Sequence, residues 1–299
     1  MRVVSLLPSA TEILYALGVE PVAVSHECDH PPAARELPAV NRSRIDADAT
    51  SGEIDSQVLA AEDGAVYEID LEALRAADPD LIVTQGLCDV CAVDQVVVED
   101  AVAELGLETE ILTLDPHSLE DVFEDVERVG AAVGAEGRAT ELVGELRERV
   151  AAVREAAAGA DRPRVAVLDW TDPVMTAGHW VPDLVETAGG DYGFPAAASV
   201  PREWAEIREY DPEVVVVAPC GFDLEQIGDN ADDLTGRPGW TELSAVRDDR
   251  VYALDGHQFV NRPGPRLVDT LEHLAGLLHP ERFERPPRDA ARPLARTVA

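Results

Sequence analysis

The four cysteines are the residues of this chain best suited to chemistry, because each stands just after an apolar run typical of a β-strand. Cys28 follows residues 22–24, Cys88 and Cys91 follow residues 81–83, and Cys220 follows residues 214–217. Ligands of open α/β sheets bind outside the carboxyl ends of the strands. We therefore expect the four thiols to line one crevice, which is the candidate working site.

The spacing of Cys88 and Cys91 is that of a Cys-x-x-Cys half-site for Zn²⁺ or an iron–sulfur cluster, which Cys28 and Cys220 would complete as a tetrathiolate. Cys₂His₂ and Cys₃His sites also hold zinc, so further candidate ligands are His26, His30 and His179. Two alternatives stay open. Either a thiolate or imidazole contacts a bound ligand or takes part in redox chemistry, or the four cysteines pack as small buried hydrophobes.

Residues 26–30 spell His-Glu-Cys-Asp-His, which matches the H-E-x-x-H pattern of zinc proteases. That chemistry needs a helix that places both histidines on one face. The segment follows a predicted strand and runs into Pro31 and Pro32, and a residue before proline is driven out of the α region. We therefore predict no protease, although His26 and His30 in a loop remain able to bind a metal or polar ligand groups.

The 299 residues carry a formal charge of −35 but are 46% hydrophobic, so the chain is expected to fold with its acid on the surface, in two compact lobes. Lysine is absent, and all 24 basic residues are arginine. This composition suits a halophilic protein, because a Debye length of about 3 Å at 1 M salt screens the repulsion. The alternative is a charge field that steers a cationic ligand.

The same composition excludes several classes of function. Without lysine the chain has no P-loop and no Schiff-base amine. Nucleic acid is excluded as a partner, because binding it requires a basic patch.

The amino terminus is too short in its apolar stretch for a secretory signal and carries no lipid-attachment cysteine. No later run is long enough to span a bilayer, so the chain is predicted not to be membrane-spanning. As written, it is predicted to be cytoplasmic, where a Cys-x-x-Cys pair binds metal or cycles redox rather than forming a structural disulfide. The alternative is the extracellular face of the membrane, if the start is trimmed.

Apolar periodicity predicts a series of strands and helices that position these residues. After a strand at residues 3–7, we expect a helix capped by Ser9, with Glu12 three residues on and Gly18 at its close. Residues 118–158 are predicted to be helical, bent or interrupted at Gly130, Gly134 and Gly137. Further strands are expected at residues 22–25, 81–85, 110–114, 164–168 and 214–217, and a helix at 70–77.

The two halves of the chain repeat one pattern: a helix ends at Asp-Pro, and a buried strand then delivers a cysteine past its end. The dipeptides are Asp78 with Pro79 and Asp211 with Pro212. The predicted fold is α/β with two lobes, each a mainly parallel sheet flanked by helices, joined by a long backbone helix. The boundaries are an N-terminal lobe at residues 1–116, a connecting helix at 117–160, a C-terminal lobe at 161–281 and a frayed tail at 282–299.

Polar and aromatic residues near the strand ends are candidates for ligand binding. Ser9 and Thr11 most simply cap the first helix, whose amide groups also form a start suited to anions. In the matching turn of the second lobe, His179 stands beside Trp180, whose ring offers a flat apolar face for a macrocycle. The alternative is packing between helix and sheet, and it applies equally to Trp170, Trp180, Phe222 and Phe259.

Two arginines, Arg262 and Arg266, flank a Pro-Gly-Pro turn. Either could bind a carboxylate or phosphate bidentately, or form a surface salt bridge instead. Asp89 and Asp223 follow strands and are candidates for helix caps.

Several motifs resemble those of a known family: residues 5–12, the Asp-Pro-Asp-Leu-Ile-Val segment, residues 184–190 and the strand at 250–252. With the long helical connection, they look like the helical-backbone, or class III, substrate-binding proteins that serve ABC importers of cobalamin, haem and ferric siderophores. The resemblance covers roughly residues 1–280. It implies two α/β lobes tied by one rigid helix, with the ligand held in the cleft between them and no catalysis.

Within that class the chain is most similar to cobalamin-binding-like proteins, on residues 86–92, 177–182, 219–223 and 262–266. The resemblance implies a monomer that binds cobalamin, another corrinoid or a related metal chelate, with an ABC permease as its partner. The thiols and the missing export signal depart from the importer pattern. The alternatives are a cytoplasmic thiolate–metal, redox or cofactor-handling protein on the same scaffold, or an importer component whose signal was trimmed.

Overall fold

The computed structural model describes residues 1–61, 66–87, 93 and 95–294, and the chain divides into two compact units. Unit 1 comprises residues 1–47, 56–116 and 120–145, and unit 2 comprises residues 48–55, 117–119 and 146–299. Each unit contains a sheet with helices beside it, so the predicted α/β fold with two lobes is confirmed. Cys88 and Cys91 lie outside the described residues.

The sheet of unit 1 is entirely parallel, in the order β2-β1-β5-β6. The central pair sets the register, with Val4 opposite Ile82. Strands of parallel sheets are covered on both faces and are therefore apolar throughout, and all five residues of β5 are buried. The four strands are β1 (Val3–Ser5), β2 (Ala23–Val24), β5 (Leu81–Gln85) and β6 (Glu110–Leu114).

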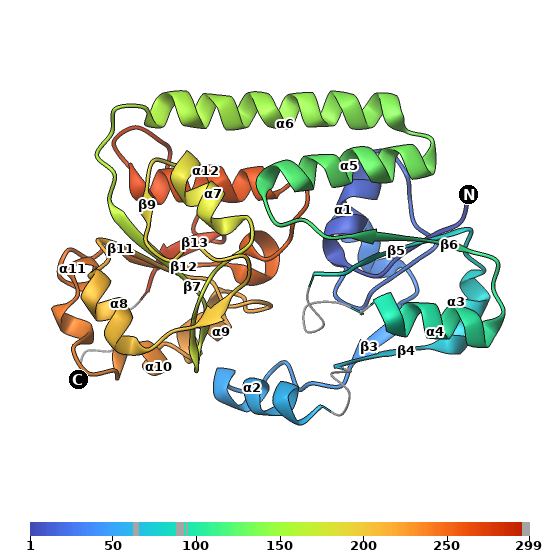
Figure 1. Ribbon diagram of the computed structural model, residues 1–299, viewed down its shortest axis with the longest axis horizontal. Helices are drawn as coiled ribbons and strands as arrows, with labels where there is room; N and C mark the ends of the chain where they lie inside the picture. The colour runs from blue at the N-terminus through green and yellow to red at the C-terminus, as the bar shows by residue number, and fades with distance from the viewer. Residues whose placement is uncertain (62–65, 88–92, 94, 295–299) are drawn as a thin grey trace. The chain divides into compact units, whose positions relative to one another are not determined.

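Helices and one antiparallel hairpin complete unit 1. In Figure 1, α3 and α4 lie on one side of β5 and β6, and α5 lies on the other. Leu74 of α3 and Val98 of α4 pack with Val4 and Ile82 in one apolar cluster, which holds these helices on the sheet. The remaining elements are α1 (Pro8–Ala16), η1 (Pro32–Glu36), β3 (Asn41–Ser43), β4 (Tyr67–Ile69), α3 (Leu71–Ala77) and α4 (Gln95–Leu105). The helix α2 (Ser51–Ala60) begins in unit 2 and ends in unit 1.

The connecting segment predicted at residues 117–160 is helical and is interrupted near the predicted glycines, so it forms two helices, α5 (Leu119–Val133) and α6 (Glu136–Ala157). The chain breaks at Gly134, whose φ of +72° only glycine adopts readily. At Gly130 a Cβ would stand 2.4 Å from the Cβ of Ala139, so glycine lets α5 and α6 approach closely. The long helix of the predicted fold is α6, and the division between the units falls inside it.

The sheet of unit 2 runs in the order β10-β8-β7-β11-β12-β13, with β9 beside β7. Its centre is parallel, because β11 pairs in parallel with β7 and β12, whereas β8, β10 and β13 are antiparallel additions. The strands are β7 (Arg164–Thr171), β8 (Val174–Thr176), β9 (Asp191–Tyr192), β10 (Val200–Pro201), β11 (Val214–Val217), β12 (Val251–Leu254) and β13 (Ala291–Pro293).

The helices of unit 2 are mostly short, apart from α12, nine of whose twelve residues are buried. They are α7 (Val181–Thr187), α8 (Trp204–Tyr210), α9 (Leu224–Asp229), α10 (Asp232–Thr235), η3 (Trp240–Glu242), α11 (Ser244–Arg247), the π-helix η4 (Gly256–Val260) and α12 (Leu267–Leu278).

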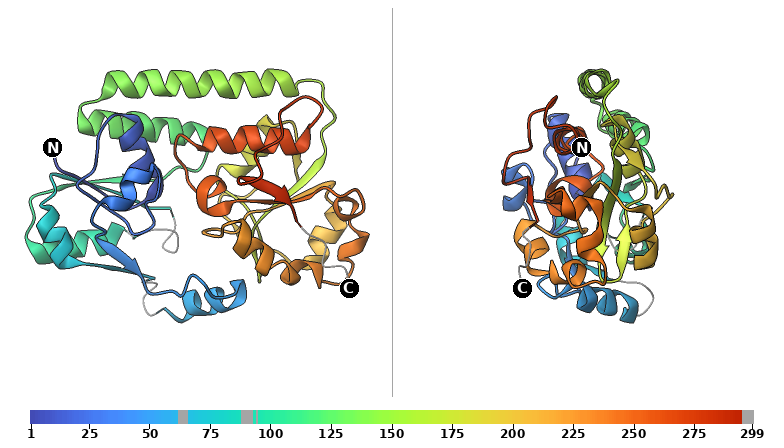
Figure 2. Two further views of the ribbon diagram at one scale, coloured as in Figure 1. Left: turned by 180° about the vertical axis from the view of Figure 1, so that it is seen from behind. Right: turned by 90° about the vertical axis from the view of Figure 1, so that its left-hand side faces the viewer.

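The predicted frayed tail at residues 282–299 is wrong for the part that the structure describes. Figure 2 shows β13 in the sheet of unit 2, where it pairs antiparallel with β12 through Ala253 and Arg292. Arg282 donates to the carbonyl oxygens of Ala156 and Ala158, at 3.2 and 3.1 Å. The strand was not predicted because it is short and takes its order from the edge of β12 rather than from its own pattern.

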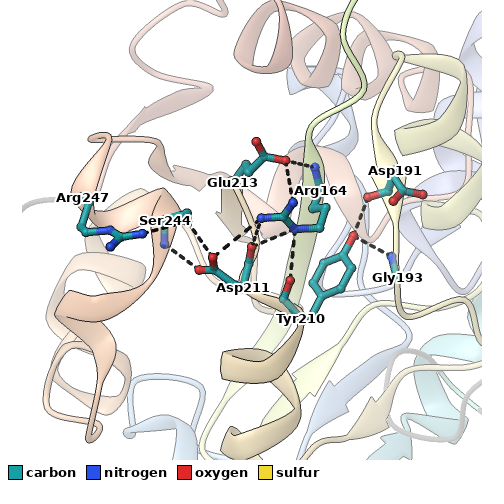
Figure 3. Close-up of polar contacts among 8 residues, drawn as sticks. All are labelled: Arg164, Asp191, Gly193, Tyr210, Asp211, Glu213, Ser244 and Arg247. Atoms are coloured by element: carbon teal, nitrogen blue, oxygen red, sulfur yellow. Dashed lines mark hydrogen bonds and ion pairs between the residues drawn. The ribbon is translucent and has the colours of Figure 1, made fainter.

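The Asp-Pro junction between helix and strand is built alike in the two units. In unit 2 the guanidinium of Arg164 donates to the carbonyl oxygens of Tyr210 and Asp211, at 3.1 and 2.8 Å (Figure 3). In unit 1 the guanidinium of Arg2 donates to the corresponding carbonyl oxygens of Ala77 and Asp78, at 2.8 and 3.0 Å. The two aspartates share the left-handed conformation, with φ of +43° and +47°. The predicted internal repeat therefore extends to side-chain detail.

Candidate functional site

In unit 1, hydroxyl and thiol groups meet where β1 ends. The Thr11 hydroxyl lies 2.8 Å from Ser5 Oγ and 3.1 Å from Cys28 Sγ. All three side chains are buried, so this cluster is desolvated. Cys28 is thus placed next to the carboxyl end of a parallel strand, as its position after the strand predicted.

Ser9 does not cap α1 as predicted, and this correction has a local cause. The helix starts two residues earlier than a Ser9 cap would place it, because Pro8 takes the first helical position, for which its fixed φ is suited. Leu7 is therefore the N-cap, without a side-chain cap bond. Ser9 is buried in the first turn, and the Thr11 hydroxyl lies 3.3 Å from Leu7 O.

His26 stands in a polar corner of unit 1. Its Nε2 lies 3.1 Å from Glu27 Oε1, its Nδ1 lies 3.2 Å from Asn41 Oδ1, and its ring contacts that of Tyr67. Burial lowers the pKa of His26, but the bonds to Glu27 and Asn41 and the charge of Glu27 outweigh it, so the pKa is raised overall. Residues 26–30 are not helical, which removes the geometry that a zinc protease needs.

In unit 2, two aromatic side chains meet beyond the ends of neighbouring parallel strands. Trp170 is the penultimate residue of β7 and Phe222 follows β11, and their ring centroids are 5.3 Å apart. Phe222 is buried, whereas Trp170 is partly exposed and its indole N–H donates to Asp172 O at 3.1 Å. The backbone N–H of Cys220 donates to Asp169 O at 3.1 Å, so Cys220 sits at the same strand end.

The turn before α7 carries a row of rings. The His179 centroid lies 5.5 Å from that of Trp180 and 5.7 Å from that of His117. Trp180 is buried, and its indole N–H donates to Val260 O at 2.8 Å, which favours the packing alternative for this tryptophan. His179 is half-buried and holds a φ of +53°.

Arg262 is a buried cation just beyond the π-helix η4. Its Nη2 donates to His257 Nε2 at 3.0 Å, which requires that nitrogen to be an unprotonated acceptor. Asp255 begins the π-helix by accepting from Gln258 N and Nε2, at 2.7 and 3.0 Å. Arg262 is only 5% exposed, so the surface salt bridge weighed for it does not fit.

The metal prediction on the four cysteines gains no support from the described part of the chain. Within that part, no group of three or more His, Cys, Asp or Glu side chains is placed to hold a metal ion. Two of the four thiols, Cys88 and Cys91, lie outside it, so convergence of the four sulfurs stays a prediction. Of the two predicted caps, Asp223 is confirmed, because it accepts from the N–H groups of Glu225 and Gln226, and Asp89 lies outside the described residues.

The structure adds one residue that sequence reasoning missed. Asp169 is the only acid within the apolar β7, and its carboxyl is 8% exposed. Burial raises the pKa of Asp169 to about 6, against the opposing effect of a hydrogen bond from Ser199. A lone carboxylate inside an apolar strand was the available signal, because buried acids are rare unless they have a role.

The described helices include none that is both long enough and apolar enough to cross a bilayer.

Comparisons with known proteins agree on the kind of molecule. The sequence pattern of the periplasmic binding protein family matches residues 3–257. An uncharacterised ABC transporter substrate-binding lipoprotein of Bacillus subtilis is 25% identical over 291 residues, covering 95% of this chain and 81% of that protein. The vitamin B12-binding protein of Vibrio cholerae is 26% identical over 284 residues, covering 93% of this chain and 88% of that protein.

Solved structures share the fold at lower identity. A periplasmic haem-binding protein from Pseudomonas aeruginosa superposes with a TM-score of 0.76 over 99% of each chain, at 21% identity. That similarity supports the fold alone.

Proposed function

The chain belongs to the periplasmic binding protein family, and from this premise we propose that it binds a metal-containing tetrapyrrole, cobalamin before haem, for an ABC importer. The family match confirms the resemblance predicted from the sequence. The observation that carries the choice of ligand is the alignment with the vitamin B12-binding protein of Vibrio cholerae, which extends over 93% of this chain. Because the haem-binding protein shares the fold, haem is the ligand to compare.

The residues of unit 2 support a flat, largely apolar ligand. The partly exposed Trp170 presents a ring face near the carboxyl end of β7, where ligands of parallel sheets bind, and the buried Phe222 packs against that ring. Aromatic rings offer large contact area at little entropic cost, which suits a macrocycle. Half-buried His179 is the neighbouring candidate for polar contacts.

Unit 1 offers a polar candidate of its own, His26. His26 is exposed and its pKa is raised, so its imidazole can donate hydrogen bonds to amide or carboxylate groups. Ser9, Thr11 and Cys28 are buried, so they support the strand end rather than reach outward. Of the predicted ligand-binding residues, we therefore retain Trp170, His179 and His26 as the primary set, with the buried Phe222 as the support of Trp170.

The partner and location follow from the same premise. The Bacillus subtilis relative is a lipoprotein of an ABC transporter, and the haem-binding relative is periplasmic. We therefore favour the extracellular face of the membrane and an ABC permease as partner. Digestion of intact cells with an added protease tests this location, and protein that stays protected until the cells are lysed would contradict it.

The ligand is tested by calorimetric titration of the full chain with cyanocobalamin and, separately, with hemin, in about 3 M KCl to screen the acidic surface. We expect a dissociation constant of about 1 μM or below for cyanocobalamin, which corresponds to about −8 kcal/mol, and weaker binding of hemin. Tighter binding of hemin would overturn the choice of cobalamin. Folded protein that binds neither would overturn the proposed function.

The aromatic contact is tested by Trp170→Ala. Loss of one ring face is expected to weaken cyanocobalamin binding about tenfold, or 1.4 kcal/mol. The matched control is Phe283→Ala, because Phe283 is also partly exposed and its ring contacts His279, away from the strand ends. Equal affinities of the two variants would remove Trp170 from the site.

A further inference from the structure

Asp169 occupies a β-bulge at the end of β7. Leu168 lies opposite Thr176 and Trp170 lies opposite Met175, so Asp169 is the extra residue between them. Bulges redirect a side chain and are frequent beside functional sites. The displaced residue here is a carboxyl group that neighbours Trp170.

The hydrogen bonding of this carboxyl is incomplete. Its Oδ2 accepts a short hydrogen bond from the Ser199 hydroxyl, whereas its Oδ1 is buried and has no hydrogen-bond partner among the described residues. A buried carboxylate with an unsatisfied oxygen is costly, so this environment favours the neutral form. Burial accordingly raises the pKa of Asp169 from 3.8 to about 6.

Ser199 ends the segment 193–199, which joins β9 to β10 and is hereafter called the cover loop. At its start, Gly193 N donates to Tyr210 Oη at 3.0 Å, and the Phe194 ring packs edge-on against Tyr210. The residues between are exposed or partly exposed apolar residues, so Ser199 carries the loop's single polar side chain. The bond to Asp169 is therefore the loop's side-chain tie at its far end.

The cover loop rests on the turn that carries His179. At Gly178 a Cβ would stand 2.3 Å from the carbonyl carbon of Ala198, so the loop backbone fills the place of a side chain. The cover loop thus contacts Gly178, which precedes His179, and Asp169, which precedes Trp170.

Charged and titratable groups surround Asp169 on several elements. Tyr192 comes from β9, and its pKa is raised by burial and by the charge of Asp169. Arg202 follows β10 and donates to Thr176 Oγ1 at 3.0 Å, and its charge lowers the pKa of Tyr192. Cys220 follows β11, and its N–H donates to Asp169 O. His179 follows Gly178, which packs against the backbone of Ala198. Only burial, Ser199 and a backbone hydrogen bond set the pKa of Asp169 itself.

We propose that the cover loop is a proton-sensitive lid that closes over neutral Asp169, where Ser199 ties it, and that opens when Asp169 ionises, because the buried carboxylate gains more from water than from the stronger bond that Ser199 then donates. Asp169 binds its proton more tightly in the closed state than in the open state, so rising pH shifts the equilibrium toward opening. A pKa near 6 in the closed state against an ordinary value in the open state corresponds to an opening equilibrium about 100-fold larger at pH 7.5 than at pH 3.5. The inference that opening exposes Trp170 and His179 to the ligand rests on the proposed function. The tie between Ser199 and Asp169 does not depend on that function.

Hydrogen–deuterium exchange of the full chain, without ligand and in about 3 M KCl, tests the lid. Deuterium uptake of peptides within residues 193–202, corrected for the intrinsic pH dependence, is expected to rise as pH increases through about 6. Asp169→Asn keeps the side-chain shape but does not ionise, so its uptake is expected to stay at the acid level throughout. Wild-type uptake that does not change, or an equal rise in Asp169→Asn, would overturn the proposal.

Two further variants keep the test decisive. Ser199→Ala lacks the tie and is expected to show high uptake in this segment already at acid pH, so an uptake equal to wild type there would overturn the proposal even if Asp169→Asn fails to fold. Asp125→Asn is the matched control, because Asp125 of unit 1 is also buried with a pKa raised to about 6. It is expected to leave uptake at residues 193–202 as in wild type, and a change there would show that the response is global and overturn the local lid.

Discussion

The Asp-Pro junctions of the two units share one design but differ in how firmly they are tied. In unit 1, Arg2 is exposed, and Asp78, which occupies the left-handed position, is exposed as well. In unit 2, Arg164 is half-buried and also pairs with Glu213 at 3.3 Å, while the Asp211 carboxylate accepts from Ser244 N and Oγ at 2.8 and 2.7 Å (Figure 3). The junction of unit 1 has its own acidic partner, because Asp80 Oδ2 accepts from Arg2 N at 2.6 Å, but only the junction of unit 2 adds an ion pair of the arginine guanidinium and the bonds to Ser244.

The same backbone motif therefore need not contribute the same free energy of folding in the two units. Hydrogen bonds from a charged donor contribute more where solvent is partly excluded. The junction of unit 2 is tied to α11 through Ser244, so it connects three elements instead of two. Unit 2 is accordingly expected to depend more on its arginine than unit 1 does.

The largest effect is expected from removing the two arginines in turn. Arg164→Met leaves two carbonyl oxygens without their side-chain donor and removes the ion pair with Glu213, and it is expected to lower the free energy of unfolding by about 3 kcal/mol. Arg2→Met removes the same carbonyl bonds in an exposed setting and is expected to cost about 1 kcal/mol. Urea unfolding in high salt measures both, and equal losses would break the comparison.

A second test compares stability across pH in unit 1. The pKa of Asp125 is raised from 3.8 to about 6, first by burial and against the effect of Arg128, whose Nη1 lies 2.7 Å from Asp125 Oδ1. A raised pKa means that the stability contribution is complete below about pH 4 and is lost as pH rises through about 6, by about 2 kcal/mol. Asp125→Asn is expected to lack this loss, and thermal unfolding at several pH values measures it. A wild-type slope retained in the variant would contradict the assignment.

The smallest effect is expected from glycine at the two left-handed positions. Asp78→Gly relieves an unfavourable φ at an exposed residue and is expected to raise the free energy of unfolding by about 0.5 kcal/mol. Asp211→Gly relieves the same φ but deletes the acceptor of two bonds from Ser244, so a net loss of about 1 kcal/mol is expected. Opposite signs would sharpen the comparison of the units, and a gain in both variants would remove it.

Much of the central sheet structure was predictable from the sequence. The runs at residues 81–85 and 110–114 are β5 and β6 as expected, and the predicted helix at 70–77 is α3 with Asp70 as its cap. These elements are set by local patterns, namely buried apolar runs and a capping aspartate. Ser9 failed as a cap because Pro8, one residue earlier, competes for the helix start.

The candidate site was less predictable because it depends on tertiary contacts. Position after a strand placed Cys28 and Cys220 near strand ends, but it did not predict that the rings of Trp170 and Phe222 pack together. No local sequence pattern shows that the Trp180 indole N–H donates to Val260 O. Nor does any show that the Ser199 hydroxyl donates to Asp169, thirty positions earlier in the chain. Ligand binding between the lobes, the monomeric state and the role of the thiols stay predictions.

The central claim, that this chain is a tetrapyrrole-binding protein, is tested most directly by equilibrium dialysis of folded protein against cyanocobalamin in about 3 M KCl, read by corrinoid absorbance. The account predicts one equivalent retained per chain, with a dissociation constant of about 1 μM or below. Folded protein that retains no corrinoid would contradict it.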